Sequence, residues 1–365
     1  MIKTILKVLL VLIISLVSII SCTTKNNDFF TIDVNYAKEQ PLKLSDIAEK
    51  IEAIDLEMTD SSLVNIGTIV RIHCTGEYIV LCQRRDIMIF DKTGKFIRKI
   101  SSIGQGPGEY ISAISLAVDI KNEYLYILCR SGKILWYDFD GNMIKESPVG
   151  YYYKGILNYI YHVNGHLLYL SEISEIVNNK RINMSFLYTI DDNLLISDSL
   201  KILKTPNDEI GGTLGGYFDY MCNDDENTYL FFGEVTSKSV VYDTLYQIKN
   251  NQIIPYLNLK FSNNGLNVVG EKEMLIFNMY KSQRYVFSIY NKNTTGVGYH
   301  FYYDIKTGKG YKFSGAFTDD VYTGAKVRIR PFDSNSNMFY YLHTNIDDTA
   351  KDEPNPTLYI GTLKK

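Results

Sequence analysis

The chain has 365 residues, of which 45% are hydrophobic and 22% are charged. Its 38 Lys and Arg against 41 Asp and Glu give a formal net charge of −3, and without residues 1–21, which hold two lysines and no acids, the balance is 36 against 41, or −5. This acidic balance excludes the basic surface that a nucleic-acid partner or a polybasic lipid-binding face would need.

The first 21 residues have the features of a secretory signal peptide. Lys3 and Lys7 precede an apolar stretch over residues 8–20, which is too short to span a membrane comfortably. The stretch ends in Ile-Ile-Ser-Cys22, which resembles a bacterial lipobox. We therefore expect acyl chains on Cys22 to be the membrane partner, since each buried CH₂ contributes about 0.8 kcal/mol. An uncleaved N-terminal anchor with an incidental cysteine is the alternative.

The rest of the chain divides into a short tether and one large domain. Residues 22–43 contain the expected lipidated cysteine and begin with the polar run TTKNND, so we expect a tether there. Residues 44–365 show short apolar runs between turn signals at about ten-residue spacing, which indicates an all-β fold. Only residues 44–50 read as a short helix.

Two ungapped repeats identify the architecture. Residues 82–99 and 129–146 share one skeleton at a distance of 47 positions, a period that indicates a solenoid or a propeller. Each repeat predicts four antiparallel strands, as in one propeller blade. The predicted strands cover 67–74, 78–82, 86–91 and 96–100 in the first blade, and 114–119, 124–129, 134–138 and 143–147 in the second.

Four less regular units follow, over residues 156–203, 217–261, 284–313 and 326–363. The last unit has only three predicted strands, whereas the strand predicted at 50–58 belongs to no complete unit. We therefore expect a six-bladed β-propeller of four-stranded antiparallel blades, whose ring is closed by pairing residues 50–58 with the last blade. Closure removes sheet edges that would otherwise template aggregation.

The mature chain retains four cysteines, Cys74, Cys82, Cys129 and Cys222. They lack the close spacing of metal ligands. Cys82 and Cys129 occupy equivalent places in the two repeats, each after a leucine. We expect buried thiols, and a disulfide between blades is the alternative, which export would permit.

Several motifs in order resemble a known family. Residues 104–110 read GQGPGEY, and a strand, a second strand and the D-x-D-G turn at 138–141 follow, an order that resembles an NHL-type repeat. The whole chain is similar to the six-bladed β-propeller lipoproteins of Bacteroidota, on the basis of the lipobox, residues 44–58, this crossing and the segment at 355–359. The resemblance covers about residues 22–365. It implies the propeller fold and a lipid-anchored place in the cell envelope, at the outer membrane on either side, and little chemistry.

The best binding hypothesis concerns one end of the ring, which we call the top face. It carries the turns between second and third strands and the crossings between blades. Arginine forks and aromatic rings there would suit an anionic glycan, a peptide carboxylate or a protein partner, although ordinary solvated turn residues are the alternative. The candidate residues are Arg84, Arg85, Arg130 and Lys133 in the turns, and Glu109, Tyr110 and Tyr217 in the crossings.

A metal site has only weak candidates. His73 and His162 fall near the ends of inner strands, and Asp119 occupies the matching place in the second blade. Three such groups could ligate zinc. However, those strand ends should face away from the top face, and no fourth histidine is in register. We therefore expect no metal and no cofactor.

The motifs of common hydrolases are missing from the sequence, which contains no G-x-S-x-G and no H-E-x-x-H. Adjacent acids such as Asp191-Asp192 and Asp319-Asp320 read as turn residues. We therefore expect a non-catalytic recognition or scaffold module tethered to the envelope, whose ligand is a glycan, a peptide or a protein. The alternative is an NHL-like propeller enzyme, a lyase or hydrolase, acting at the mouth of the central channel.

Overall fold

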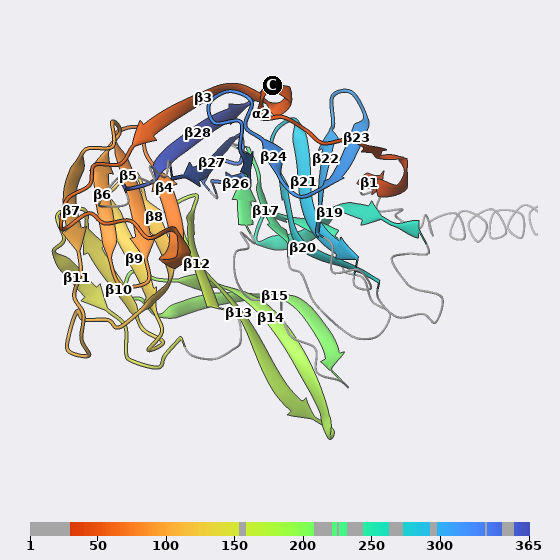
Figure 1. The fold of residues 1–365 in the computed structure, drawn as a ribbon. Helices are drawn as coiled ribbons and strands as arrows, with labels where there is room; N and C mark the ends of the chain where they lie inside the picture. The colour runs from red at the N-terminus through yellow and green to blue at the C-terminus, as the bar shows by residue number, and fades with distance from the viewer. Residues whose placement is uncertain are drawn as a thin grey trace, which may run out of the picture.

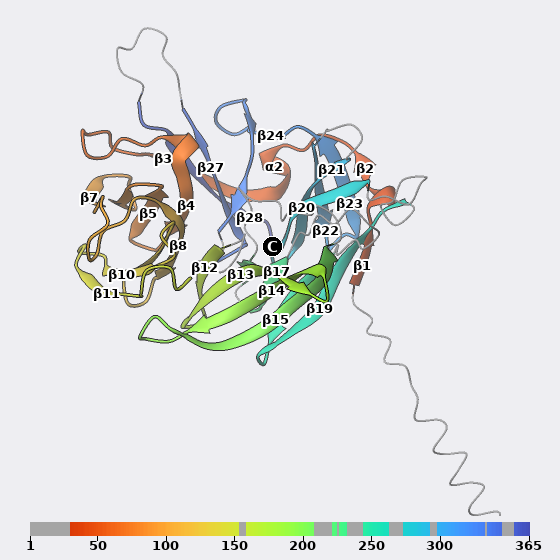
Figure 2. The ribbon, with the colours of Figure 1, turned by 90° about the horizontal axis from the view of Figure 1, so that it is seen from below.

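The described residues form six blades arranged in a ring, beside one separate two-stranded hairpin, so the predicted six-bladed β-propeller is confirmed (Figures 1 and 2). The computed structural model describes residues 30–152, 158–207, 221–224, 226–231, 244–262, 273–292, 298–332, 334–344 and 354–365. Within these residues, no helix has the length and apolar character needed to cross a bilayer.

Blades 1 to 3 each contain four antiparallel strands that pair in chain order. Blade 1 consists of β4 (Ile69–Cys74), β5 (Tyr78–Gln83), β6 (Ile87–Asp91) and β7 (Phe96–Ile100). Blade 2 consists of β8 (Ala113–Asp119), β9 (Tyr124–Cys129), β10 (Ile134–Asp138) and β11 (Met143–Glu146). Blade 3 consists of β12 (Asn158–Val163), β13 (His166–Val177), β14 (Lys180–Ile190) and β15 (Ile196–Asn207). In blades 1 and 2 every predicted boundary lies within two residues of the observed one.

Blades 4 to 6 were less regular in sequence, and some predicted boundaries are wrong there. Blade 4 consists of β16 (Met221–Asn223), β17 (Thr228–Phe231), β18 (Thr244–Lys249) and β19 (Gln252–Lys260). Blade 5 consists of β20 (Met274–Lys281), β21 (Tyr285–Lys292), β22 (Gly298–Asp304) and β23 (Lys309–Ser314). Blade 6 consists of β26 (Arg330–Pro331), β27 (Met338–His343), β28 (Thr357–Leu363) and β3 (Ala48–Asp55). Blade 5 begins with β20, before the predicted start at residue 284. Blade 6, whose unit was predicted to begin at residue 326, begins with β26 instead, because β25 (Lys326–Val327) pairs with β24 (Phe317–Thr318) in a separate hairpin.

The ring closes as predicted through the N-terminal strand. β3 pairs antiparallel with β28, with Ile51 opposite Gly361 and Ile54 opposite Leu358. The strand covers 48–55 rather than 50–58, and a register shift lies between Thr362 and Leu363. The short helix α2 (Leu44–Ile47) precedes it, and the Asp46 side chain accepts the N–H of Lys43 at 2.9 Å.

Residues before α2, which we expected to belong to the tether, are packed onto the propeller. β1 (Phe30–Asp33) pairs parallel with β19 as a fifth strand of blade 4. After the 3₁₀ turn η1 (Val34–Tyr36), β2 (Lys38–Glu39) pairs parallel with β23 in blade 5. Ile32 and Val34 are buried. The N-terminal segment therefore contributes a strand to each of the last three blades.

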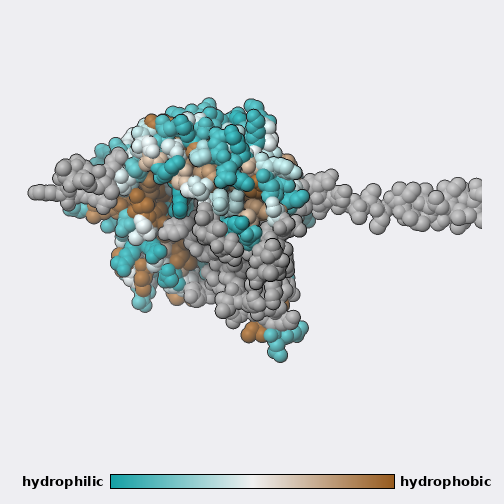
Figure 3. All heavy atoms as spheres, turned by 45° about the vertical axis from the view of Figure 1, so that its right-hand side comes forward, coloured by the Kyte–Doolittle hydropathy of each residue, from teal (hydrophilic) through white to brown (hydrophobic). Residues whose placement is uncertain are grey.

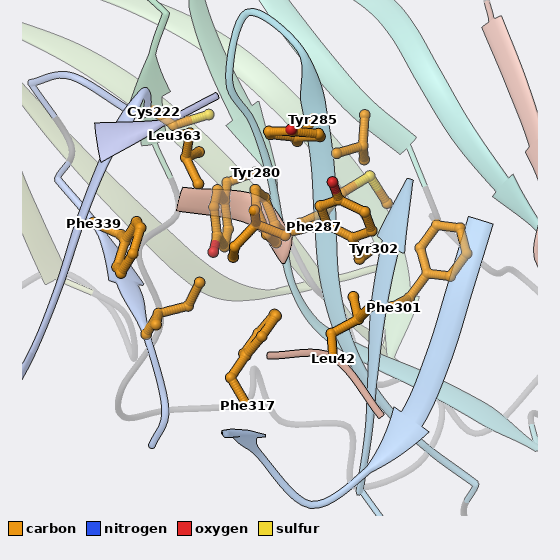
Figure 4. Close-up of a cluster of buried hydrophobic side chains, with 14 of the residues drawn as sticks. Leu42, Cys222, Tyr280, Tyr285, Phe287, Phe301, Tyr302, Phe317, Phe339 and Leu363 are labelled. Atoms are coloured by element: carbon orange, nitrogen blue, oxygen red, sulfur yellow. The ribbon is translucent and has the colours of Figure 1, made fainter. Parts of the chain in front are cut away.

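The largest core cluster combines aromatic rings of blade 5 with side chains from the two ends of the chain (Figure 4). Tyr280 and Phe287 stack with ring centroids 4.7 Å apart. Leu42 from the N-terminal segment and Leu363 from β28 belong to the same cluster. Each fully buried side chain of this size contributes roughly 1.5–3 kcal/mol, so this cluster fastens both chain ends to blade 5.

A buried polar network joins the inner strands of blades 4, 5 and 6. Lys281 Nζ lies 2.5 Å from Asp224 Oδ2 and 3.0 Å from the carbonyl oxygen of Ser282. Ser336 of blade 6 donates its hydroxyl to the carbonyl oxygen of Asn223 at 2.9 Å. Buried polar groups of this kind are tolerated because their hydrogen bonds are satisfied.

The aspartates shared by the two sequence repeats cap turns. Asp91 accepts the backbone N–H of Thr93 and of Lys95 at 2.8 and 3.0 Å, and Asp138 accepts that of Asn142 at 2.8 Å. Asp304 caps the corresponding turn of blade 5. These Asx turns end the third strands of blades 1, 2 and 5, and the repeated aspartates are thus structural.

Blade 3 carries an extension that its sequence did not predict. β12 ends its pairing at Asn158 opposite Ser171, but β13 and β14 continue to Val177 opposite Lys180. The tip residues Asn178 and Asn179 have φ of 52° and 60°, as a two-residue hairpin turn requires. Figure 1 shows this long hairpin projecting from the ring.

Burial alternates along the outer strands. In β7, for example, partly buried and exposed residues alternate before the buried Ile100, as a strand with one face toward water requires. In the view of Figure 3, hydrophilic residues cover the upper side of the ring.

Candidate functional site

The top-face arginines are exposed, as their place in turns suggests. Arg84, Arg85 and Arg130 lie between the second and third strands of blades 1 and 2. The backbone of Arg84 is fixed by a hydrogen bond from its N–H to Thr68 at 3.1 Å and one from Ala113 to its carbonyl oxygen at 2.6 Å. Within the described part of the chain, no ion pair involves these three guanidinium groups.

The other described top-face candidates point into the protein. Lys133 is 3% exposed, and its Nζ lies 3.0 Å from Glu146 Oε2 and 3.3 Å from the carbonyl oxygen of Gly106. Tyr110 is 1% exposed and donates its hydroxyl to Ile100 at 3.4 Å. Neither side chain is available to a ligand, because each already satisfies the backbone of the crossing or the strand before it. Tyr217 and Cys22 lie outside the described residues.

Glu109 folds back on the glycine-rich crossing. Its Oε2 accepts the N–H of Gly106 at 2.8 Å, and a Cβ on Gly104 would lie 1.9 Å from the same oxygen. Glycine is therefore required at position 104 to let the carboxylate approach the backbone. The crossing binds its own glutamate, rather than presenting that glutamate on the surface.

The structure brings together only two of the three weak metal candidates. Asp119 Oδ2 lies 3.5 Å from His162 Nε2, whereas His73 is buried with its Nε2 3.4 Å from the carbonyl oxygen of Leu116. Across the described residues, no three His, Cys, Asp or Glu side chains converge as metal ligands. Asp119 and His162 both line one cleft of the described residues.

This pair lies in a cleft of about 490 Å³ between blades 2 and 3. The volume falls within the 300–1,000 Å³ that small-molecule sites occupy. The cleft is built from the first turn of each of the two blades and from the last turn of blade 3, so it opens at the end of the ring opposite the top face. The residues that line it are Asp119, Asn122, Tyr124, Tyr126, Trp136, His162, Gly165, His166, Leu167, Thr189, Ile190, Asp191, Asp192, Leu194 and Ser197.

One wall of the cleft is aromatic. Tyr124 and Tyr126 point to the same side of β9 because they are two residues apart, and Trp136 on β10 is the direct neighbour of Tyr126. The ring centroid of Trp136 lies 5.2 Å from that of Tyr124 and 5.4 Å from that of Tyr126. His162 stacks on Tyr126 at 6.1 Å with an interplanar angle of 17°. The rings thus form a continuous row from blade 2 into blade 3.

Asp119 supplies the polar, hydrogen-bonding part of the cleft, and its side chain also caps its own turn. Its Oδ1 accepts the N–H of Lys121 and of Asn122 at 3.1 and 3.2 Å, and its Oδ2 accepts the Asn122 amide at 2.7 Å. Burial lowers the pKa of His162 below its usual 6.5, and the nearby Asp119 carboxylate offsets part of this effect. Near neutral pH the imidazole beside Asp119 is therefore largely uncharged.

The charge of the lining is one-sided. Three carboxylates belong to it, those of Asp119, Asp191 and Asp192, while Lys and Arg do not occur among its residues. At the rim, Lys145 donates to the Asp192 carbonyl oxygen at 2.6 Å and to Asn193 Oδ1 at 3.2 Å. Its Nζ also lies 5.9 Å from the centre of the Trp136 ring.

Sequence reasoning placed Asp119 and His162 near this end of the ring but missed the aromatic wall. The available signal was the spacing of Tyr124 and Tyr126, which put both rings on one face of a strand, together with Trp136, the only tryptophan of the chain. The sequence could not show which residues face this aromatic wall, because the second wall of the cleft comes from blade 3, about 40 residues later in the chain.

Comparison with known proteins supports the fold. The structure is similar to that of a protein described as a "Putative exported protein" from Bacteroides fragilis, with a TM-score of 0.64 and 17% identity over 92% of this chain and 100% of that one. BamB from Moraxella catarrhalis is matched with a TM-score of 0.45 and 10% identity, over 84% of this chain and 99% of that one. No curated protein matches the chain. A family model described as a domain of unknown function, DUF4934, matches residues 29–362, and the chain therefore belongs to this family.

Proposed function

We propose that this chain is a non-catalytic recognition module of the cell envelope that binds its ligand in the cleft between blades 2 and 3. The cleft carries this proposal, because an aromatic wall faces hydrogen-bonding groups across a volume that fits a small ligand. Top-face binding has less support, since among the described candidates Lys133 and Tyr110 are buried and Glu109 folds back on the crossing, which leaves the three arginines exposed.

The envelope location rests on the N-terminal sequence. The signal-like residues 1–21 and the lipobox at Cys22 support a lipoprotein of the Bacteroidota type with its acyl chains in the outer membrane. In cells grown with an alkyne analogue of palmitate, the wild-type protein should be labelled and a Cys22→Ser variant should not. Equal labelling of both would contradict the anchor.

The hydrogen bonds of Asp119 favour binding over catalysis. Both of its carboxylate oxygens are occupied in capping the turn, which leaves little freedom for proton transfer. The alternative is a hydrolase or lyase, and the observation that favours it is the contact between His162 and Asp119, since a carboxylate can orient an imidazole that acts as a base. This pair lies in the cleft and not at the channel mouth.

A binding screen with site-directed variants tests the proposal. The full-length lipoprotein in detergent would be titrated by calorimetry with neutral and acidic oligosaccharides, peptides and polyamines. For any compound that binds, Tyr124→Ala should weaken binding, because it removes one ring of the cleft. A variant with Arg84, Arg85 and Arg130 all changed to alanine is the matched control and should bind normally. The reverse outcome would move the ligand site to the top face, and turnover of a compound would favour the enzyme.

A further inference from the structure

We propose that the group recognised by this cleft is a cationic amine, such as the ammonium of a lysine side chain or of a polyamine. The inference rests on the cleft being the ligand site, as proposed above, and adds the chemistry of the ligand. It follows from three features of the lining: its charge, its aromatic faces and the position of Lys145.

The charge of the lining requires a positive complement. Asp119 is 6% exposed, and its hydrogen bonds come from backbone and amide donors that carry no charge. Two histidines, His162 and His166, belong to the lining, and burial lowers the pKa of His162. No lysine or arginine of the lining balances Asp119, Asp191 and Asp192. A ligand with its own positive charge would make the potentials across the interface complementary, whereas an anionic ligand would be repelled.

The aromatic wall offers π faces to such a cation. A cation within about 6 Å of the centre of a Trp or Tyr ring is attracted by the ring quadrupole, with Trp the strongest. The cleft supplies the partly exposed rings of Trp136 and Tyr124, whereas Tyr126 is buried and stacks on His162. Carboxylates beside aromatic faces combine the two interactions that hold an ammonium group.

Lys145 shows that the rim of the cleft already holds an ammonium group of the chain itself, between an aromatic ring and two uncharged oxygens. Its Nζ lies 5.9 Å from the centre of the Trp136 ring and donates to two oxygens of the neighbouring turn, on Asp192 and Asn193. The contact lies at the rim, on the outer strand β11, and the row of rings continues inward from it. A ligand amine would repeat the same contacts deeper in the cleft.

The fluorescence of Trp136 can report ligand binding in the cleft directly, because Trp136 is the only tryptophan of the chain. Its fluorescence would be followed during titration with N-acetyl-lysine amide and tetramethylammonium chloride, at constant ionic strength. N-acetyl-norleucine amide is the neutral control of nearly the same shape as the lysine probe. We expect a saturable change with both cations and none with the norleucine probe.

Three variants separate recognition from general charge effects. Asp192→Asn should weaken binding of the cations by roughly fivefold. Asp60→Asn makes the same change in net charge at an exposed position of another blade and should leave binding unchanged. Lys145→Met should strengthen binding by a similar factor, because it removes a competing positive charge. Thermal melting of each variant would establish that it is folded.

The outcomes are distinguishable from those of the proposed function. If the norleucine probe binds as well as the lysine probe, or if neither cation gives a saturable change, the amine inference is wrong. If a neutral oligosaccharide instead changes Trp136 fluorescence and loses this effect in Tyr124→Ala, the cleft remains the ligand site with another ligand. If compounds that bind the protein are insensitive to Tyr124→Ala, the proposed site fails as well.

Discussion

The ammonium group of Lys281 in blade 5 lies 2.5 Å from a carboxylate oxygen of Asp224 in blade 4, and both side chains are more than nine-tenths buried. The same ammonium lies 4.9 Å from the centre of the Tyr229 ring. Removing two charges from water is expensive, so such a pair adds little net stability, but losing one partner leaves the other charge buried and uncompensated. The pair thus makes the boundary between blades 4 and 5 sensitive to substitution.

Lys281→Met should lower the free energy of unfolding by about 3–5 kcal/mol, because it leaves the Asp224 carboxylate buried without its cation. A double variant that also carries Asp224→Leu should recover much of the loss, since neither charge then needs compensation. Urea unfolding of the wild type and the variants gives the comparison. A loss below about 1 kcal/mol for Lys281→Met would show that the pair is solvated in solution.

Two equivalent glycines should respond differently to alanine. Gly94 and Gly141 have φ of +89° and +85°, and alanine is strained at both by about 1–2 kcal/mol. A Cβ on Gly94 would lie 2.2 Å from the carbonyl oxygen of Asp55, whereas at Gly141 the nearest atom, on Ile100, is 3.5 Å away. Gly94→Ala should therefore be more destabilising by roughly 2 kcal/mol.

Thermal and urea unfolding of the two alanine variants would measure this difference. Gly141→Ala is the matched control, because it introduces the same backbone strain in the same turn of the next blade. Equal losses of stability would mean that the closing strand, which ends at Asp55, does not pack against the turn of blade 1 as the structure shows.

Stability should fall with acid partly through His300. Burial, with a smaller effect of Arg328, lowers its pKa to about 4, against 6.5 in an unfolded chain. The unfolded state therefore binds the extra proton first as the pH falls. The free energy of unfolding is unaffected by this proton above pH 6.5. It falls as the pH drops from 6.5 toward 4, and the loss is complete below that, with a total on the order of 3 kcal/mol.

His300→Phe should flatten this pH dependence. The imidazole stacks on Phe313 at 5.5 Å with an interplanar angle of 12°, so a phenyl ring can replace it without a charge. The free energy of unfolding of the variant, measured in urea at several pH values between 7 and 4, should lose the slope that one proton contributes. An unchanged slope would assign the acid sensitivity to other groups.

Three thiols should be unreactive until the protein unfolds, those of the buried Cys82 and Cys129 and of the partly exposed Cys74. Burial raises the pKa of Cys74, Cys82 and Cys129 to about 12, so roughly one thiol in ten thousand is ionised at pH 8. An aromatic disulfide reagent should label none of the three in the native protein and all of them in urea. Cys82 and Cys129 are free in the structure, and failure to label them in urea without reductant would instead indicate the alternative disulfide.

Local pattern was enough to predict much of the fold. Gly94 and Gly141 recur with their aspartates at the same place in an ungapped repeat, which located eight strands of blades 1 and 2, and the unmatched strand near Ile51 then predicted the closure of the ring. The added strands β1 and β2 escaped prediction because they contain only four and two residues. Their pairing is set by partners more than 200 residues away.

The candidate site was less predictable, because side-chain direction depends on neighbours. Lys133 lies in a polar turn, and nothing local indicates that its ammonium reaches back to Glu146 and to the glycine-rich crossing. Trp136 and His162 belong to different blades, so their shared cleft exists only after the blades pack. The aromatic spacing in β9 was visible, but its meaning depended on that packing.

The N-terminal segment also sets an order of assembly. A chain synthesised from its N-terminus produces β1, β2 and β3 first, yet their partners include residues 257–260, 311–312 and 357–363. Each of these early strands must remain unpaired until its partner leaves the ribosome, and β3 must wait longest, for residues 357–363. Blades 1 to 3 can meanwhile form from local contacts. The pairing of β3 with β28 therefore depends on complete synthesis of the last strand, since a chain truncated before residue 357 cannot close its ring.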